Sequence, residues 1–139
     1  MDKSTAILVV DDQKAVAVTL ADILGAKGFN VYAATSGAEA LKVMEKQPID
    51  ILLTDVRMPD MDGVKLNREA RKTHPDITTY LMTAYAADEI IQQGMKEGIK
   101  TVLTKPLNID LVVSLFSAFK SMSTKAGSAG KNEKLGPPF

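Results

Sequence analysis

Short apolar runs alternate along the chain with segments whose apolar residues recur at helical spacing. Continuous apolar runs bounded by turn residues are typical of strands buried on both faces of a parallel sheet. Apolar residues repeating about every 3.6 positions are typical of amphipathic helices. The pattern predicts five strands, over residues 5–10, 29–33, 51–54, 78–82 and 101–104, and five helices, over residues 13–27, 36–47, 63–73, 86–97 and 108–122.

Strict alternation of strands and helices predicts parallel strands joined by right-handed crossovers, with helices on both faces of the sheet. The expected fold class is therefore α/β, a three-layer, doubly wound (βα)5 domain of flavodoxin-like type. A five-stranded sheet of this kind commonly has the strand order 2-1-3-4-5. That order places the topological switch point, where ligands bind, between the first and third strands.

The apolar periodicity stops after Met122. The remaining residues, STKAGSAGKNEKLGPPF, are small, polar and interrupted by Gly and Pro, a composition typical of flexible tails and linkers. We therefore expect one folded domain over residues 1–122, followed at 123–139 by a flexible tail or the start of an interdomain linker. A chain of 139 residues is long enough for one such domain.

Polar side chains stand at the carboxyl ends of four predicted strands. Asp11 and Asp12 follow the first strand, Asp55 the third, Thr83 the fourth and Lys105 the fifth. Each alone has an ordinary explanation: a helix cap, a strand-end turn residue or a solvated lysine. Because the carboxyl ends of parallel strands meet at one edge of the sheet, we expect these side chains to lie together.

Three neighbouring carboxylates repel one another, so at neutral pH they need a cation or a raised pKa. The chain has no cysteine, and its single histidine lies elsewhere. Oxygen ligands alone favour a hard divalent ion, Mg²⁺ or Mn²⁺. A carboxylate beside such an ion, an ammonium group and a hydroxyl group can also accept a phosphoryl group.

Composition excludes several classes of function. Without cysteine there are no disulfides, thiolate metal sites or cysteine nucleophiles. Lys and Arg together number 17, as do Asp and Glu, and there is no tryptophan, so we expect no direct binding of nucleic acid. No apolar run approaches the roughly 18 residues of a membrane helix. The sequence predicts a cytoplasmic protein that does not bind membranes.

Four motifs in this order resemble the receiver domains of two-component response regulators, including the chemotaxis regulators. They are VVDD ending at Asp12, LLTDVRMPDMDG around Asp55, MTA around Thr83 and TKP around Lys105. The resemblance covers about residues 5–122. It implies that a histidine kinase or a phosphotransfer protein phosphorylates Asp55. It also implies a signalling phosphoacceptor rather than an enzyme, whose only chemistry is its own phosphorylation and dephosphorylation.

The resemblance also implies roles for the surrounding residues. Lys105 would pair with the acceptor or its phosphoryl group, Thr83 would be the switch hydroxyl, and Pro106 would follow a cis peptide bond that helps to aim Lys105. The implied ligands of Mg²⁺ are the carboxylates of Asp11, Asp12 and Asp55 and the backbone carbonyl of Arg57.

Three positions depart from the family or adjust its behaviour. The family usually has Tyr or Phe three residues before the lysine, as the rotating partner of the switch threonine; here that residue is Val102. Tyr85 is a candidate substitute, or simply a solvent-facing loop aromatic. Arg57 stands where the family controls the access of water, and we expect its side chain, with Tyr85, to shield the acyl phosphate.

The resemblance implies an output surface formed by residues 86–97, 101–104 and 108–122. This surface would bind a downstream protein, an output domain of the same protein, or a second copy to form a homodimer. The extra apolar residues of the last helix, Leu111 and Val113, suit such a surface and equally suit a covered helix flank.

Two other functions use related sites. A Mg²⁺-dependent aspartyl-phosphate phosphohydrolase of the haloacid dehalogenase type would need a second Asp two residues after its nucleophile, where this chain has Arg57, and a cap insertion that no segment provides. Flavodoxin-like binding of FMN would need a phosphate cradle after the first strand, where this chain is acidic.

Overall fold

The computed structural model describes residues 5–130 and the side chains of residues 5–119. Strands and helices alternate along this part of the chain as the periodicity predicts. The strands are β1 (Ala6–Val10), β2 (Asn30–Ala34), β3 (Ile51–Asp55), β4 (Thr78–Thr83) and β5 (Thr101–Thr104). The helices are α1 (Lys14–Ala26), α2 (Gly37–Lys46), α3 (Gly63–Ala70), α4 (Ile90–Lys96) and α5 (Ile109–Gly130). The chain divides into two units after Leu107, and α5 belongs to the second.

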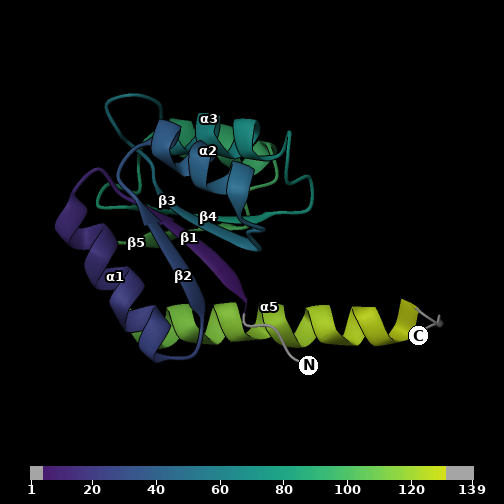
Figure 1. Ribbon diagram of the computed structural model, residues 1–139. Coiled ribbons are helices and arrows are strands. Elements are labelled where there is room, and N and C mark those ends of the chain that lie inside the picture. Colours follow the sequence, from purple (N-terminus) through teal and green to yellow (C-terminus); the bar gives the residue numbers. More distant parts are fainter. Residues whose placement is uncertain (1–4, 131–139) are drawn as a thin grey trace. The chain divides into compact units, whose positions relative to one another are not determined.

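The five strands form one parallel sheet in the order β2-β1-β3-β4-β5, which confirms the predicted topology. Figure 1 shows α1 on one face of this sheet and α2 and α3 on the other. Helix α4 packs with α3, since Ile91 and Val64 belong to one buried cluster. Because β1 lies beside β3, their carboxyl ends are adjacent at the switch point of the topology.

The central strands form because both of their faces are buried. Every residue of β1 is buried. Leu8 and Val10 belong to the cluster that includes Ala40 of α2 and Leu66 of α3. Neighbouring side chains along a strand point to opposite faces, so an uninterrupted apolar run is what a strand covered on both sides requires. The same burial continues in β3 up to Thr54, and it lessens at Asp55, where the strand ends.

Two helices differ in length from the sequence-based prediction. Helix α4 begins at Ile90 rather than near Ala86, because the preceding residues form a turn in which Asp88 N donates to Tyr85 O over 3.3 Å. Helix α5 continues past Met122 to Gly130. No proline occurs between Met122 and Pro137, and extending an existing helix is far easier than starting one. The predicted tail is therefore helical over 123–130; its remainder, 131–139, lies outside the described residues.

No helix in the described part of the chain is both long enough and apolar enough to cross a membrane.

The apolar side of α3 is interrupted by Asn67, which is completely buried. Its side-chain Oδ1 accepts hydrogen bonds from Thr79 Oγ1 of β4 at 2.7 Å and from Arg71 Nε at 3.3 Å. Its Nδ2 has no hydrogen-bond partner among the described residues. A buried donor left without a partner costs roughly 1–3 kcal/mol, so this polar contact between α3 and β4 stabilises the fold less than a well-packed apolar pair would.

Replacement of both polar residues tests this interpretation. Asn67→Leu alone leaves the buried Thr79 hydroxyl without its acceptor, and Thr79→Val alone removes the strongest partner of Asn67. Each single variant should therefore unfold about 1–2 kcal/mol more easily. The double variant removes all three buried polar atoms and should be at least as stable as the parent, as measured by urea unfolding. Additive losses in the double variant would contradict the interpretation.

Candidate functional site

Asp11 and Asp12 follow directly after β1, at the carboxyl edge of the sheet. Asp11 is completely buried, and its Oδ1 accepts a hydrogen bond from Gln13 N at 2.9 Å, just before α1 begins. Asp12 is exposed. The pair therefore divides into one carboxylate fixed inside the site and one that faces solvent.

Asp55 is the last residue of β3, and its side chain is 14% exposed. Its Oδ1 accepts a hydrogen bond from Val56 N at 3.0 Å. Gly63, the first residue of α3, lies so close that a Cβ atom there would be 2.5 Å from the backbone oxygen of Asp55. The start of α3 can approach the end of β3 this closely only with glycine at position 63.

The three carboxylates meet as predicted. Asp11, Asp12 and Asp55 each provide a carboxylate oxygen, and these atoms all lie within 4.8 Å of one another. The donors are oxygens only, they carry three formal charges, and they combine buried, exposed and half-buried positions. This set fits a hard divalent cation that keeps some of its water ligands.

Lys105 follows β5 and brings an ammonium group to the same place. Its Nζ lies 2.7 Å from Asp11 Oδ2 and 3.3 Å from Asp55 Oδ2. It thus contacts the buried carboxylate of Asp11 more closely than the carboxylate of Asp55 itself. The Lys105–Pro106 peptide bond is cis, as the family resemblance predicts.

Burial and charge act in opposite directions on the ionisation of these groups. Burial is the largest effect on Asp55 and raises its pKa, the charge of Lys105 opposes it, and the charge of Asp11 adds to it. For Lys105, burial lowers the pKa, but the hydrogen bond to Asp11 and the charges of both carboxylates outweigh it, so the pKa is raised. Lys105 is therefore a permanent cation, and Asp55 is a carboxylate held in an unfavourable environment.

Thr83 ends β4, and its side chain is directed to the following backbone. Its hydroxyl accepts a hydrogen bond from Tyr85 N at 3.0 Å and donates one to Tyr85 O at 3.2 Å. The register places Thr83 beside Thr104 of β5, immediately before Lys105. The Tyr85 ring itself is exposed, with 68% of the residue surface accessible.

Val102 lies in β5 and packs against the buried cluster that contains Leu81, Ile91 and Ile99. An aliphatic side chain in this position has no ring and no polar atom that could contact the Thr83 hydroxyl.

Arg57 makes a contact that the sequence does not reveal. Its Nε and Nη2 atoms each lie 2.7 Å from a carboxylate oxygen of Asp88, which precedes α4. This ion pair lowers the pKa of Asp88, chiefly through its hydrogen bonds, and raises that of Arg57. The guanidinium group therefore forms a bidentate ion pair with a carboxylate in the loop between β4 and α4.

The loop between β3 and α3 (residues 56–62) is attached at further points. Asp62 caps α3, accepting a hydrogen bond from Lys65 N at 2.7 Å. Asp60 accepts hydrogen bonds from Gly37 N at 3.2 Å and Ala38 N at 3.0 Å, so it binds the start of α2. Neither the contact of Asp60 with α2 nor that of Asp88 with Arg57 is evident from the sequence. Opposite charges on loops that follow adjacent strands were the available signal for Arg57 and Asp88.

Comparison with known proteins gives a consistent result. Residues 7–117 match the response regulator receiver domain family. A response regulator receiver protein of Anaeromyxobacter sp. (strain Fw109-5) is 39% identical over 108 residues, which is 78% of this chain and 45% of that protein. Sporulation initiation phosphotransferase F of Bacillus subtilis is 32% identical over 104 residues, covering 75% of this chain and 84% of that protein.

Solved structures agree with the sequence matches. A response regulator protein from Burkholderia pseudomallei, crystallised with a phosphorylated aspartic acid, a calcium ion and citrate, superimposes with a TM-score of 0.75 at 27% identity. The match covers 94% of this chain and 76% of that one. The chain spans less than half the length of the Anaeromyxobacter relative.

The raised pKa of Asp55 predicts a variant that is more stable than the parent. A carboxylate with a raised pKa disfavours the folded state once ionised: the cost is absent below the ordinary value of 3.8 and complete above the folded pKa. In metal-free buffer, Asp55→Asn should therefore raise the free energy of unfolding at neutral pH by about 1.4 kcal/mol for each unit of pKa shift, and with it the unfolding temperature. This gain should shrink as the pH falls toward 3.8.

Thermal unfolding of both proteins from about pH 4 to about pH 8 checks this. Asp76→Asn, an exposed carboxylate in the loop before β4, is the matched control and should show no such trend. Equal midpoints for parent and Asp55→Asn at every pH would contradict the prediction.

Proposed function

Because this chain belongs to the response regulator receiver domain family, we propose that Asp55 is its phosphoacceptor and that phosphorylation changes the surface around α4. The supporting observation is the convergence of three carboxylates and one ammonium group at the switch point of the sheet. Receiver domains are signalling phosphoacceptors. A phosphohydrolase would need a second aspartate two residues after Asp55, and this chain has Arg57 there.

The transfer reaction is a displacement at phosphorus. A carboxylate oxygen of Asp55 supplies the electron pair of a new P–O bond, and the P–N bond of a phosphohistidine on the donor protein breaks. The histidine nitrogen takes the electron pair of the broken bond together with a proton from solvent. The product is a mixed anhydride on Asp55. Little covalent assistance is needed, so positioning and charge neutralisation are the tasks left to the protein.

We assign the metal site to Asp11, Asp12 and Asp55, with the backbone carbonyl of Arg57 as a further ligand. Mg²⁺ or Mn²⁺, when bound, offsets the charge of the carboxylates and of the transferring phosphoryl oxygens. Asp11 is fixed for this role by its hydrogen bond from Gln13 N, whereas exposed Asp12 can adjust its position.

Lys105 would hold the phosphoryl group from the other side. Its ammonium group already lies between Asp11 and Asp55, so a short movement toward Asp55 brings it to a phosphoryl oxygen. Thr83 would donate its hydroxyl hydrogen to another of these oxygens. Because that hydroxyl now bonds to Tyr85, its movement would release the Tyr85 backbone. Val102 offers no aromatic ring to follow this movement, so the loop after β4 must transmit it.

The partners follow from the family and remain proposals for this protein. A histidine kinase or a phosphotransfer protein would donate the phosphoryl group. A downstream protein, an output domain or, in a homodimer, a second copy of this chain would bind the rearranged surface. Hydrolysis of its own acyl phosphate would return the domain to the resting state.

Incubation with Mg²⁺ and acetyl phosphate tests the proposed function. Mass spectrometry should find one phosphoryl group on each parent molecule and none on Asp55→Asn. Phosphate release should stay slow, since the adduct is a signalling state. Many turnovers of released phosphate would favour the phosphohydrolase instead, and a parent that forms no Mg²⁺-dependent adduct would overturn the proposal.

Arg57 and Tyr85 are proposed to shield the acyl phosphate from water. Arg57→Ala should then shorten the lifetime of the phosphorylated protein several-fold, as followed by decay of the adduct after removal of the donor. Arg68→Ala is the matched control, because Arg68 forms a similar forked ion pair, with Glu97, away from the site. An unchanged lifetime in Arg57→Ala would show that the shielding idea is wrong.

A further inference from the structure

The segment between β4 and α4 (residues 84–89, the β4–α4 segment) is held by Thr83, the last residue of β4, and by Arg57, two residues after Asp55. The Thr83 hydroxyl bonds to the backbone of Tyr85 at 3.0 and 3.2 Å. The Arg57 guanidinium group bonds to Asp88 with two contacts of 2.7 Å. Tyr85 O also accepts from Asp88 N at 3.3 Å, which joins the two attachments into one network.

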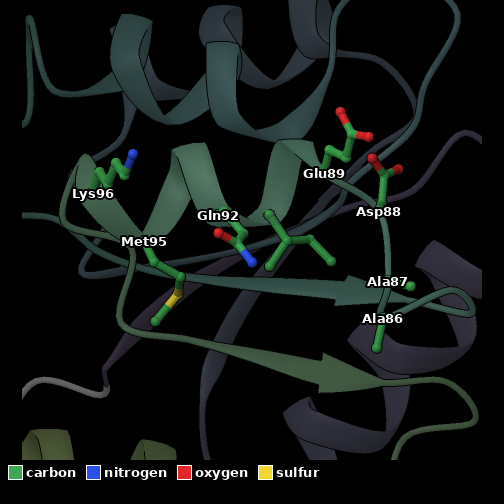
Figure 2. Close-up of a pocket in the computed structure, with 8 residues that line it drawn as sticks. Ala86, Ala87, Asp88, Glu89, Gln92, Met95 and Lys96 are labelled. Carbon is green, nitrogen blue, oxygen red and sulfur yellow. The ribbon is translucent and has the colours of Figure 1, made fainter.

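Asp88 determines where α4 begins. Its Oδ1 accepts a hydrogen bond from Ile90 N, the first residue of the helix, at 3.2 Å. Figure 2 shows Asp88 at this end of α4, with Ala86 and Ala87 in the segment that leads to it. The Asp88 side chain is only 9% exposed, whereas that of Arg57 is 67% exposed. The arginine thus covers the carboxylate while remaining accessible itself.

The opposite end of α4 is attached by separate contacts. Glu97 receives hydrogen bonds from Arg68 Nε and Nη2 at 3.0 and 2.8 Å, and Gly98 O receives one from Arg71 at 3.1 Å. Gly94 packs so tightly that a Cβ atom there would lie 2.8 Å from Ile99. The last turn of α4 is therefore attached to α3 by contacts that do not involve Arg57 or Asp88.

Arg57 has a second possible partner once Asp55 is modified. Two residues span at most about 7 Å of chain, a distance that an arginine side chain can cover. A protein-bound phosphoryl group carries about −1.5 to −2 charges, against −1 for Asp88. Both groups accept the forked hydrogen bonds of a guanidinium group. The Arg57 side chain is 67% exposed, so water can hydrate its guanidinium group while it changes partners.

We propose that Asp88 is a positioning residue that holds Arg57 away from Asp55, and that Arg57 leaves Asp88 for the phosphoryl group when Asp55 is phosphorylated. The exchange uncovers Asp88 and frees the first turn of α4, which gives this chain a route from the site to α4 that does not need an aromatic residue at position 102. The inference rests on the proposed function, since it requires an acyl phosphate at Asp55.

Decay of the phosphorylated protein tests the competition. Asp88→Asn keeps an oxygen for Ile90 N but weakens the hold on Arg57, so the acyl phosphate should last about two- to fivefold longer. In the Arg57→Ala background, Asp88→Asn should change nothing, because the arginine that it releases is absent. Glu97→Gln, which weakens the matching ion pair at the other end of α4, is the control and should leave the lifetime unchanged.

The possible results separate the two levels of the proposal. If the parent forms no adduct at Asp55, the proposed function fails and the inference fails with it. If adducts form normally but Asp88→Asn leaves the lifetime unaltered, or alters it equally with and without Arg57, the inference alone is overturned.

A spectroscopic measurement adds a readout that a purely structural role would not move. The Nε–H resonance of Arg57 reports its bond to Asp88. It should shift when beryllium fluoride and Mg²⁺ are added to form a phosphoryl mimic on Asp55, and the Ile90 amide should shift with it. In Asp88→Asn, the Arg57 resonance should be displaced before any addition. Resonances of Arg57 and Ile90 that ignore the mimic in the parent protein would overturn the inference.

Discussion

The contact of Lys105 with Asp11 and Asp55 carries the charge balance at the carboxyl edge of the sheet. Asp11 is completely buried and Asp55 is largely buried, and burial raises the pKa of Asp55 while the charge of Lys105 opposes that effect. One ammonium group cannot compensate three carboxylates, which leaves a negative site suited to a divalent ion and an incoming phosphoryl group. The β1–β3 adjacency and the close turn at Gly63 bring these charges together.

The loop after Asp55 connects the site to other elements of the first unit. Through Asp60 it binds the start of α2, through Asp62 the start of α3, and through Arg57 the residue that precedes α4. One loop of seven residues, 56–62, thus contacts the starts of α2 and α3 and, through Arg57, the Asp88 side chain that binds the start of α4. A change at the strand end that carries Asp55 can therefore reach several helices without any movement of the sheet.

The Arg57–Asp88 ion pair is a second attachment of the β4–α4 segment, and it bears on the presence of valine at position 102, where the family usually has an aromatic residue. Val102 packs against the apolar cluster, and this chain therefore has no aromatic ring at that position. Thr83 and Arg57 both end on the β4–α4 segment instead, through hydrogen bonds and an exposed ion pair. Contacts of this kind exchange partners more readily than buried side chains rearrange, because water can replace them during the change.

The sequence by itself determined the alternation of strands and helices and the residues at the ends of the strands, because burial periodicity and strand ends are local properties. The strand order was expected only because it is common in such sheets. The tertiary structure decided contacts between loops that are distant in the chain: Arg57 with Asp88, Asp60 with α2, and Lys105 closer to Asp11 than to Asp55. It also decided the late start of α4 and the buried pair of Asn67 and Thr79. A charged or polar side chain in a loop has many possible partners, and only the packing of the sheet selects one.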